Sequence, residues 1–219
     1  MTIVAFAKIN DTYGVNLLSA YVESAFQGEE NRRYLDEIYA RKNQNSVKES
    51  LSALALLRRL SVRCGADNSS LILKKSEGGK PYFQNSALRF SISHSHGYVA
   101  AAISDSCEVG LDVEASDMSP EQAKKLASRF FNNDELAKLD SSPESFLRIW
   151  TKKEAYAKMR GIALSKLISN EKNGIENERE TTFFYCFDVD GYSLTLCSEI
   201  YDGDVRLLEE SIEEMIKCH

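Results

Sequence analysis

The spacing of apolar side chains changes partway along the chain, and this change constrains the fold more than any other feature. A period near 3.6 residues runs through Val47, Leu51, Leu54 and Leu57. This period predicts an amphipathic helix that ends near Gly65. From Leu88 onward apolar and polar residues alternate, and strands are expected over residues 88–93, 98–103 and 109–114. The sequence therefore predicts an α+β fold with helices packed on small antiparallel sheets.

Local signals predict the remaining elements. A first strand is expected over residues 1–8, further helices over 34–42 and 205–217, and a polar loop over 169–180. Helix starts are predicted at the S-x-x-E pattern of Ser46, at Ser119-Pro120 and at Ser142-Pro143, the last helix running to Arg160. The dipeptide Asp190-Gly191 separates apolar segments 181–189 and 192–200 and predicts a tight hairpin.

Composition excludes several classes of protein. The 219 residues carry 33 Asp and Glu against 27 Lys and Arg, a net charge of −6, which argues against binding to a nucleic-acid backbone. The five cysteines form no C-x-x-C pair, which favours a reducing, cytoplasmic setting. No apolar segment approaches the ~20 residues that cross a bilayer. We expect a cytoplasmic protein without nucleic-acid or membrane partners, divided into subdomains at residues 1–107 and 108–219.

Two carboxylates alternate with apolar residues in the segment Val109-Gly-Leu-Asp-Val-Glu114. Strand geometry places Asp112 and Glu114 on one face of the strand, whereas Leu111 and Val113 enter the core. Neighbouring carboxylates repel each other, and a hard divalent cation such as Mg²⁺ would stabilise them. A solvated strand face is the alternative, and the pair alone favours it because the D-x-E pattern is common by chance.

A second charged group lies on the helix predicted to begin at Pro143. Trp150, Glu154 and Lys158 follow at intervals of four residues and therefore share one helix face. Glu154 could complete a magnesium site, and Lys153 and Lys158 could balance the charge of a phosphate-bearing substrate. The alternative is a surface pair of Glu154 and Lys158 beside a buried Trp150.

A glycine turn, Gly78-Gly79-Lys80-Pro81, precedes the strand that ends in Ser93-His94-Ser95-His96. The two glycines allow a tight turn that presents Lys80. Taken alone, the turn favours an ordinary surface hairpin, and a histidine at a strand end favours a simple hydrogen bond. Beside the carboxylates, His94 becomes a candidate phosphate contact, whereas no role can be assigned to His96.

Four segments follow one another in a fixed order. They are Gly79-Lys-Pro-Tyr82, Ile92-Ser-His94, Val109-Gly-Leu-Asp-Val-Glu114 and Trp150-x-x-Lys-Glu-x-x-x-Lys158. In this order they resemble the signatures of the Sfp-type 4′-phosphopantetheinyl transferases. The resemblance implies a magnesium-dependent enzyme that moves the phosphopantetheine arm of coenzyme A to a serine of an apo-acyl or apo-peptidyl carrier protein. It also implies a monomer of two similar α+β subdomains, related by a pseudo-twofold axis, with coenzyme A between them.

The resemblance also assigns roles to single residues. The family's metal ligands match Asp112, Glu114 and Glu154. Its coenzyme A contacts match Lys75, Lys80, Ser93, His94, Lys153 and Lys158, with Arg41 and Lys42 near the 3′-phosphate. Lys158 and His94 would stabilise the leaving phosphate, and either Glu154 or a water on the metal would accept the proton of the carrier serine.

Two other classes of function remain open at this point. A metal-dependent phosphodiesterase also needs clustered acids and a lysine, although the net charge of −6 counts against it. A non-catalytic module that binds coenzyme A or a carrier would not need all of Asp112, Glu114, Glu154 and Lys158. The motifs do not identify the pathway of the carrier, which could be fatty acid, polyketide or nonribosomal peptide biosynthesis. Lys124, Lys125 and Arg129 could meet an acidic carrier or form a solvated helix face.

Overall fold

A computed structural model describes residues 1–115, 117–140, 142–172 and 182–217. The strands are β1 (Thr2–Lys8), β2 (Leu73–Lys75), β3 (Pro81–Phe83), β4 (Arg89–Ser95), β5 (Tyr98–Ser104), β6 (Val109–Ala115), β7 (Phe183–Val189), β8 (Tyr192–Ser198) and β9 (Arg206–Glu209). The helices are α1 (Val15–Ala25), α2 (Glu29–Tyr39), α3 (Gln44–Arg63), α4 (Pro120–Phe130), α5 (Asn133–Leu136), α6 (Pro143–Arg160), α7 (Leu164–Lys172) and α8 (Ile212–Lys217). The predicted α+β class is confirmed.

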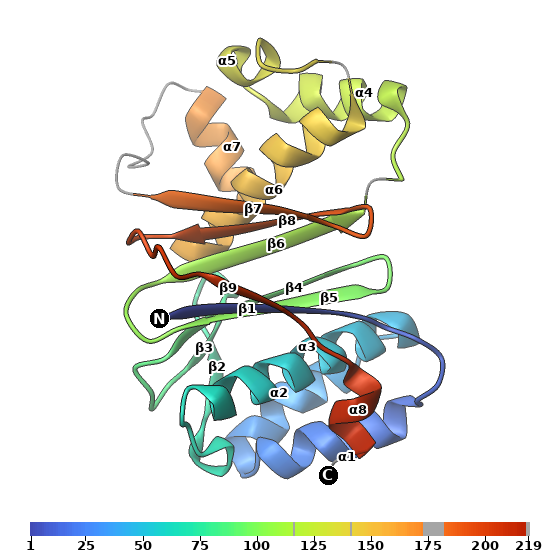
Figure 1. Cartoon of the computed structure of the whole chain (residues 1–219), viewed down its shortest axis with the longest axis vertical. Helices are drawn as coiled ribbons and strands as arrows, with labels where there is room; N and C mark the ends of the chain where they lie inside the picture. Colours follow the sequence, from blue (N-terminus) through green and yellow to red (C-terminus); the bar gives the residue numbers. More distant parts are fainter. Residues whose placement is uncertain (116, 141, 173–181, 218–219) are drawn as a thin grey trace.

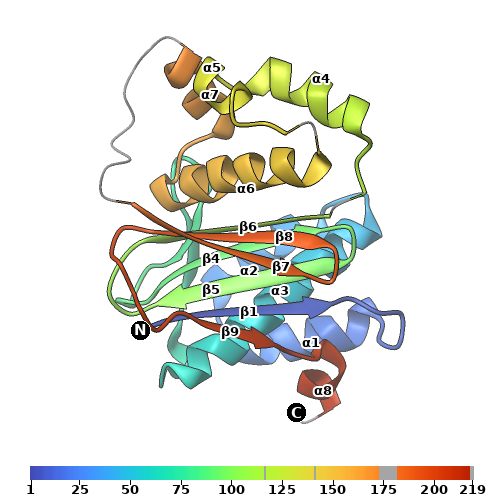
Figure 2. The same ribbon diagram turned by 45° about the horizontal axis from the view of Figure 1, so that its top comes forward.

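The elements form four layers, with two sheets in the middle and helices on both outer sides (Figure 1). One sheet has the strand order β4-β5-β1-β9, and the other has the order β6-β8-β7. Helices α1, α2, α3 and α8 cover the outer face of the first sheet, and the helices α4 to α7 lie beyond the second (Figures 1 and 2). Strands β2 and β3 form a separate short hairpin.

Both faces of the first sheet are buried, which explains why its strands are almost continuously apolar. In β5, Val99, Ala101 and Ile103 pack against the outer helices, whereas the alternate residues Ala100 and Ala102 face the second sheet. Leu111, Val113 and Leu194 of the second sheet pack against these residues in the layer between the two sheets. Burial on both faces therefore fixes how the two sheets stack.

The same order of elements occurs twice along the chain. In the first half, β1 is followed by α1 to α3 and then by the β4–β5 hairpin, whose second strand pairs antiparallel with β1. In the second half, β6 is followed by α4 to α7 and then by the β7–β8 hairpin, whose second strand pairs antiparallel with β6. Strand β9 returns to the first sheet and runs parallel to β1. The division between residues 107 and 108 stays a prediction.

Most start and stop signals in the sequence act as predicted. Ser119 and Ser142 cap α4 and α6 with their side chains, and Gly161 ends α6 in a left-handed conformation with φ of 62°. Asp190 and Gly191 form the β7–β8 turn, with φ values of 48° and 79°. Positive φ at both positions matches the right-handed twist of the two strands.

Other boundaries were wrong. Helix α3 begins before Ser46, because the Asn43 side chain accepts hydrogen bonds from the amides of Asn45 and Ser46 and caps the helix there. Residues 205–217 are not one helix, because residues 206–209 pair with β1 before α8 begins. Strand β6 pairs with β8 in the second sheet.

The predicted helix over residues 34–42 is α2, which begins and ends earlier, and helix α1 was not predicted. Of the loop predicted over residues 169–180, residues 169–172 belong to α7, and the rest lies outside the described residues. Within the described ranges, no helix combines the length and the apolar character that crossing a membrane requires.

Candidate active site

Helix α6 packs closely on strand β6, and Gly110 makes this approach possible. A Cβ atom at Gly110 would stand 1.9 Å from the carbonyl oxygen of Ala155 and 2.4 Å from the amide nitrogen of Met159. Any side chain there would push the helix away from the strand. The polar face of β6 is thereby held against the α6 face that carries Glu154 and Lys158.

Asp112 is the most enclosed carboxylate of this group, with only 3% of its surface exposed. Its Oδ1 accepts hydrogen bonds from Lys158 Nζ at 2.7 Å and from Ser93 Oγ at 3.0 Å. Its Oδ2 is buried and has no hydrogen-bond partner among the described residues. Because an unpartnered buried oxygen is costly, Oδ2 marks a position where a cation or a hydrogen-bond donor fits.

Glu114 lies two residues further along the same face of β6. Ser95 on β4 donates a hydrogen bond from Oγ to Glu114 Oε2 at 2.8 Å. Burial and the negative charge of Asp112 raise the pKa of Glu114, and the bond from Ser95 partly offsets them. Asp112 therefore disfavours the charged form of Glu114, as expected of a carboxylate pair that can accept a cation.

Glu154 faces these carboxylates from α6. Burial raises its pKa to about 7, the charges of Asp112 and Glu114 add to this rise, and Lys158 opposes it. A carboxyl group with this pKa can take up or release a proton near neutral pH. The structure therefore brings Asp112, Glu114, Glu154 and Lys158 together, as the sequence predicted.

His94 enters the same region from β4. Its Nδ1 lies 3.2 Å from Glu49 Oε2 on α3. Burial lowers the pKa of His94; Glu49 opposes this effect, and the positive charges of Lys158 and Arg41 add to it. The positive charges of Arg41 and Lys158 therefore act on His94. The structure brings Arg41, His94 and Lys158 into one group.

Further basic residues lie around Arg41. Arg41 donates a hydrogen bond to Ser50 Oγ at 2.6 Å. Lys75 forms an ion pair with Glu37, and its hydrogen bond and charge, together with the charge of Arg41, lower the pKa of that carboxyl group. Arg41 and Lys75 are therefore both close enough to Glu37 for their charges to act on it. Lys42 follows Arg41 in the chain with an exposed side chain.

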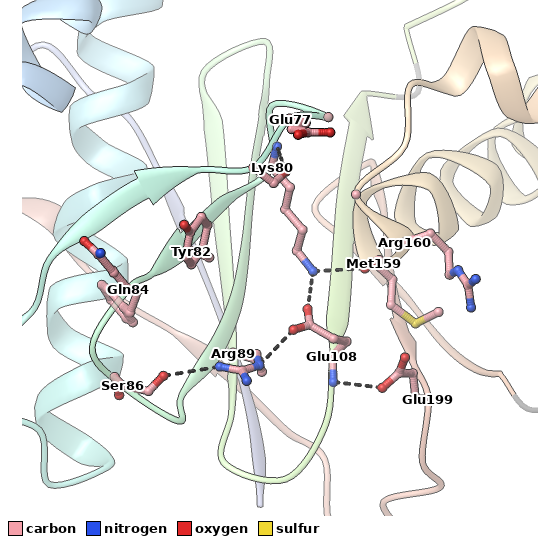
Figure 3. A pocket seen from close by; sticks show the side chains of 14 residues that line it. Glu77, Lys80, Tyr82, Gln84, Ser86, Arg89, Glu108, Met159, Arg160 and Glu199 are labelled. Carbon is pink, nitrogen blue, oxygen red and sulfur yellow. Dashed lines mark hydrogen bonds and ion pairs between the residues drawn. The ribbon is translucent and has the colours of Figure 1, made fainter.

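Lys80 reaches from the glycine turn to the end of α6 (Figure 3). Its Nζ donates to Glu108 Oε2 at 2.5 Å, to the carbonyl of Val109 at 3.1 Å and to the carbonyl of Met159 at 3.0 Å. A pocket of about 870 Å³ opens beside Lys80, and a smaller one of about 210 Å³ is lined by both Lys80 and Lys158. Lys80 thus fastens the glycine turn to α6 at the edge of both pockets.

Lys153 is kept apart from these residues. It points to the other side of α6, where its Nζ lies 2.7 Å and 2.8 Å from the two carboxylate oxygens of Glu135. Its side chain is 1% exposed. Adjacent helix positions point in directions about 100° apart, so Lys153 cannot share the face of Glu154. Lys153 is therefore left out of the residues proposed to contact coenzyme A, because its ammonium group is bound to Glu135.

The residues fit a magnesium ion by the chemistry of their donors. Mg²⁺ prefers carboxylate oxygens and keeps some positions for water and substrate. In the described part of the chain, no three His, Cys, Asp or Glu side chains are already close enough to form a metal site. The partnerless Oδ2 of Asp112, next to the raised pKa values of Glu114 and Glu154, is nevertheless where a cation would be most stabilising.

Sequence reasoning missed the polar residues that orient the site. On β4, Ser93 and Ser95 donate hydrogen bonds to Asp112 and Glu114, whereas Ser91 accepts from the Leu111 amide and touches no carboxylate of the site. Serines at alternate positions of one strand were the available signal. Glu49, the partner of His94, gave no signal, because it lies in the remote helix α3.

Comparison with known proteins gives a consistent assignment. Residues 108–207 match the model of the 4′-phosphopantetheinyl transferase superfamily. The chain is 30% identical over 172 residues to the 4′-phosphopantetheinyl transferase gsp of Aneurinibacillus migulanus, covering 71% of this chain and 70% of that protein. It is 26% identical over 225 residues to the 4′-phosphopantetheinyl transferase Sfp of Bacillus subtilis, covering 92% of this chain and all of that protein.

A shorter match, 39% identical over 100 residues, relates 42% of this chain to 51% of the 4′-phosphopantetheinyl transferase AcpT of Salmonella typhimurium. The superfamily match contains Asp112, Glu114, Glu154 and Lys158. The resemblance seen in the four motifs is confirmed, and the chain belongs to the 4′-phosphopantetheinyl transferase superfamily.

Proposed function

We propose that this protein transfers the 4′-phosphopantetheine arm of coenzyme A to a serine hydroxyl of an apo-acyl or apo-peptidyl carrier protein and releases 3′,5′-ADP. The observation that carries the proposal is the meeting of Asp112, Glu154 and Lys158 between β6 and α6, in a chain of this superfamily. The partly buried ammonium group of Lys158, beside a Glu154 carboxyl group whose pKa is raised to about 7, suits phosphoryl transfer better than simple binding.

Coenzyme A would lie between the two halves of the chain. Lys158, Ser93 and His94 stand where its pyrophosphate would pass, and Arg41 lies near enough to His94 to meet a further phosphate. Lys42 follows Arg41 in the chain, and Lys75 acts with Arg41 on Glu37, so both lysines would add positive charge around the 3′-phosphate. Lys80 is held by three oxygen atoms, so its main contribution would be to fix the glycine turn, against which the nucleotide would pack.

Asp112, Glu114 and Glu154 would hold Mg²⁺. Bound there, the ion would supply positive charge to the pyrophosphate. Asp112 keeps Lys158 in place through the 2.7 Å ion pair, so the lysine would be positioned before the substrate arrives. Preorganised charge of this kind needs no rearrangement during the reaction.

Either Glu154 or a water on the metal would accept the proton of the carrier serine. Without a metal, burial raises the pKa of Glu154 to about 7, which suits a base near neutral pH, whereas a bound cation would favour its charged form and leave the water as the base. In the transfer, the serine oxygen forms a bond to the β-phosphorus of coenzyme A, and the bond from that phosphorus to the bridging oxygen breaks. The electron pair leaves with 3′,5′-ADP, whose new charge Lys158 and His94 would stabilise.

We also propose the cellular setting that fits this reaction. The protein would act as a cytoplasmic monomer on a carrier of fatty acid, polyketide or nonribosomal peptide biosynthesis. Subdomain 1–107 would contribute Arg41, Ser93 and His94, and subdomain 108–219 would contribute the carboxylates and Lys158. Among the described residues, the cysteines form no disulfide, which suits a reducing compartment.

Analysis of the nucleotide products tests this proposal against its rivals. With coenzyme A and Mg²⁺, we expect 3′,5′-ADP to appear only when an apo-carrier is also present. Release of 3′,5′-ADP without a carrier would instead indicate a metal-dependent phosphodiesterase. Binding of coenzyme A without release of 3′,5′-ADP in the presence of any carrier would indicate a non-catalytic binding module.

A further inference from the structure

His96, which the four motifs leave without a role, lies in the turn between β4 and β5. It adopts φ of 46°, followed by Gly97 at 83°. Positive φ at both turn positions is the favoured geometry of a two-residue hairpin, as at Asp190 and Gly191, and histidine is among the residues enriched there. This turn places the His96 imidazole beside Ser95.

The imidazole of His96 is linked to the carboxylates through one hydroxyl group. His96 Nδ1 lies 3.0 Å from Ser95 Oγ, and Ser95 Oγ donates to Glu114 Oε2 at 2.8 Å. A hydroxyl group has a single hydrogen to donate. Since that hydrogen goes to Glu114, His96 Nδ1 must carry the proton and donate to Ser95.

The surroundings of the turn hold this arrangement in place. The Tyr192 hydroxyl donates to the carbonyl oxygen of His96 at 2.9 Å, and the Gly97 amide donates to Glu49 Oε1 at 3.4 Å. On the outer side, His96 Nε2 lies 3.8 Å from Asp117 Oδ2. The backbone of the turn is therefore fixed from both halves of the chain, whereas the long, exposed contact with Asp117 adds little.

We propose that Ser95 and His96 are positioning residues for Glu114, with His96 holding the Ser95 hydroxyl in the orientation that donates to the carboxylate. This inference rests on the proposed role of Glu114 as a magnesium ligand. Hydrogen-bond partners behind metal ligands orient those ligands and tune their affinity for the metal. The chain of contacts from His96 through Ser95 to Glu114 gives the site such support from the β4–β5 turn.

Three variants isolate this chain of contacts. His96→Gly removes the imidazole, and glycine adopts the positive φ of this position readily. A loss of Mg²⁺ affinity in this variant would therefore not come from an unfavourable backbone conformation. Ser95→Ala removes the hydroxyl that touches Glu114. Ser91→Ala is the matched control, because Ser91 lies on the same strand face but bonds to the Leu111 amide instead of a carboxylate.

Calorimetric titration with Mg²⁺ alone, without coenzyme A or a carrier, measures the effect. We expect His96→Gly and Ser95→Ala each to weaken Mg²⁺ affinity by about tenfold, the lower end of the range for such partners. The double variant should be no weaker than Ser95→Ala, because both substitutions break one chain. Ser91→Ala should keep the wild-type affinity, and thermal unfolding without metal checks that each variant is folded.

Several results would overturn the inference. They are an unchanged Mg²⁺ affinity in His96→Gly, losses that multiply in the double variant, or no Mg²⁺ binding by the wild type. Transfer activity is measured separately, as kcat and KM for coenzyme A, and we expect kcat to fall with little change in KM. A wild type that binds Mg²⁺ with this pattern but modifies no carrier would refute the proposed function and leave the positioning role standing.

Discussion

Lys158 Nζ lies 2.7 Å from Asp112 Oδ1, and this ion pair joins α6 to β6 at the centre of the site. Gly110, two residues before Asp112, lets the helix approach closely enough for the pair to form. The lysine also donates to Ser93 of the first half of the chain at 2.9 Å. One ammonium group therefore links both halves at the place where a phosphate would bind.

Removing this ammonium should cost activity more than folding. We expect Lys158→Ala to lower kcat by about 100- to 1,000-fold, the usual effect of losing one preorganised charge at a transition state. Steady-state transfer assays check the value. Lys152→Ala is the control, because Lys152 lies on the same helix with its Nζ over the Phe184 ring instead. Equal losses in the two variants would contradict the role given to Lys158.

The close approach of α6 predicts that Gly110 tolerates no side chain. Gly110→Ala would place its Cβ against the α6 backbone and should lower the free energy of unfolding by about 1–3 kcal/mol, as overpacked cores do. Urea unfolding measures the loss. The control is Gly14→Ala, where no atom lies within 4 Å of the new Cβ. A fully stable and active Gly110→Ala would show that the helix does not depend on this contact.

Glu154 makes stability depend on pH in a defined direction. Its pKa rises from an ordinary 4.5 to about 7 in the folded protein, so the folded state binds more protons than the unfolded state between these values. The free energy of unfolding contributed by Glu154 therefore falls as pH rises from about 4.5 to about 7.

Chemical unfolding without Mg²⁺ at several pH values tests this sign. Glu154→Gln should lose most of the dependence. Because a proton and Mg²⁺ compete for the same carboxylate, Mg²⁺ affinity should rise over the same pH interval in the wild type. A Glu154→Gln variant with the wild-type pH dependence would contradict the assignment.

His94 predicts a pH effect on ligand binding. Burial lowers its pKa, so the free imidazole is neutral near pH 7, whereas a bound phosphate dianion would favour the protonated form. Coenzyme A binding without metal should therefore take up a proton and strengthen as pH falls toward 6. Calorimetry in buffers of different ionisation enthalpy measures the proton. His94→Ala should abolish this uptake, and an unchanged uptake would locate it elsewhere.

The buried pair of Lys153 and Glu135 predicts the opposite pattern to Lys158. Removing one partner of a buried ion pair leaves an uncompensated charge and costs about 3–5 kcal/mol. We therefore expect Lys153→Met to lower the free energy of unfolding strongly while leaving coenzyme A affinity unchanged. Loss of coenzyme A affinity in the folded variant would restore the ligand contact predicted from the sequence.

Sequence patterns predicted the features that depend on local rules. Helix caps at Ser119 and Ser142, the end of α6 at Gly161 and the hairpin at Asp190-Gly191 follow from the chemistry of neighbouring residues. The placement of Asp112 and Glu114 on one face of β6 follows from strand alternation.

Features that depend on contacts across the fold were not predictable in this way. Strand β9 was mistaken for helix because its pairing partner, β1, lies at the other end of the chain. Lys153 was expected in the site because it lies within the linear motif. The motif does not show that Lys153 forms an ion pair with Glu135 on the other side of α6. The support of Glu114 by Ser95 likewise depends on how two strands from different sheets meet.

The intact mass of the carrier protein tests the central claim most directly. Apo-carriers of the acyl and peptidyl types are incubated with the protein, coenzyme A and Mg²⁺, and each carrier is weighed by mass spectrometry. We predict that at least one gains the mass of a phosphopantetheine group on its serine, and that EDTA or Asp112→Ala abolishes the gain. Carriers that stay unmodified with the wild type, or a gain that persists with EDTA and in Asp112→Ala, would contradict the account.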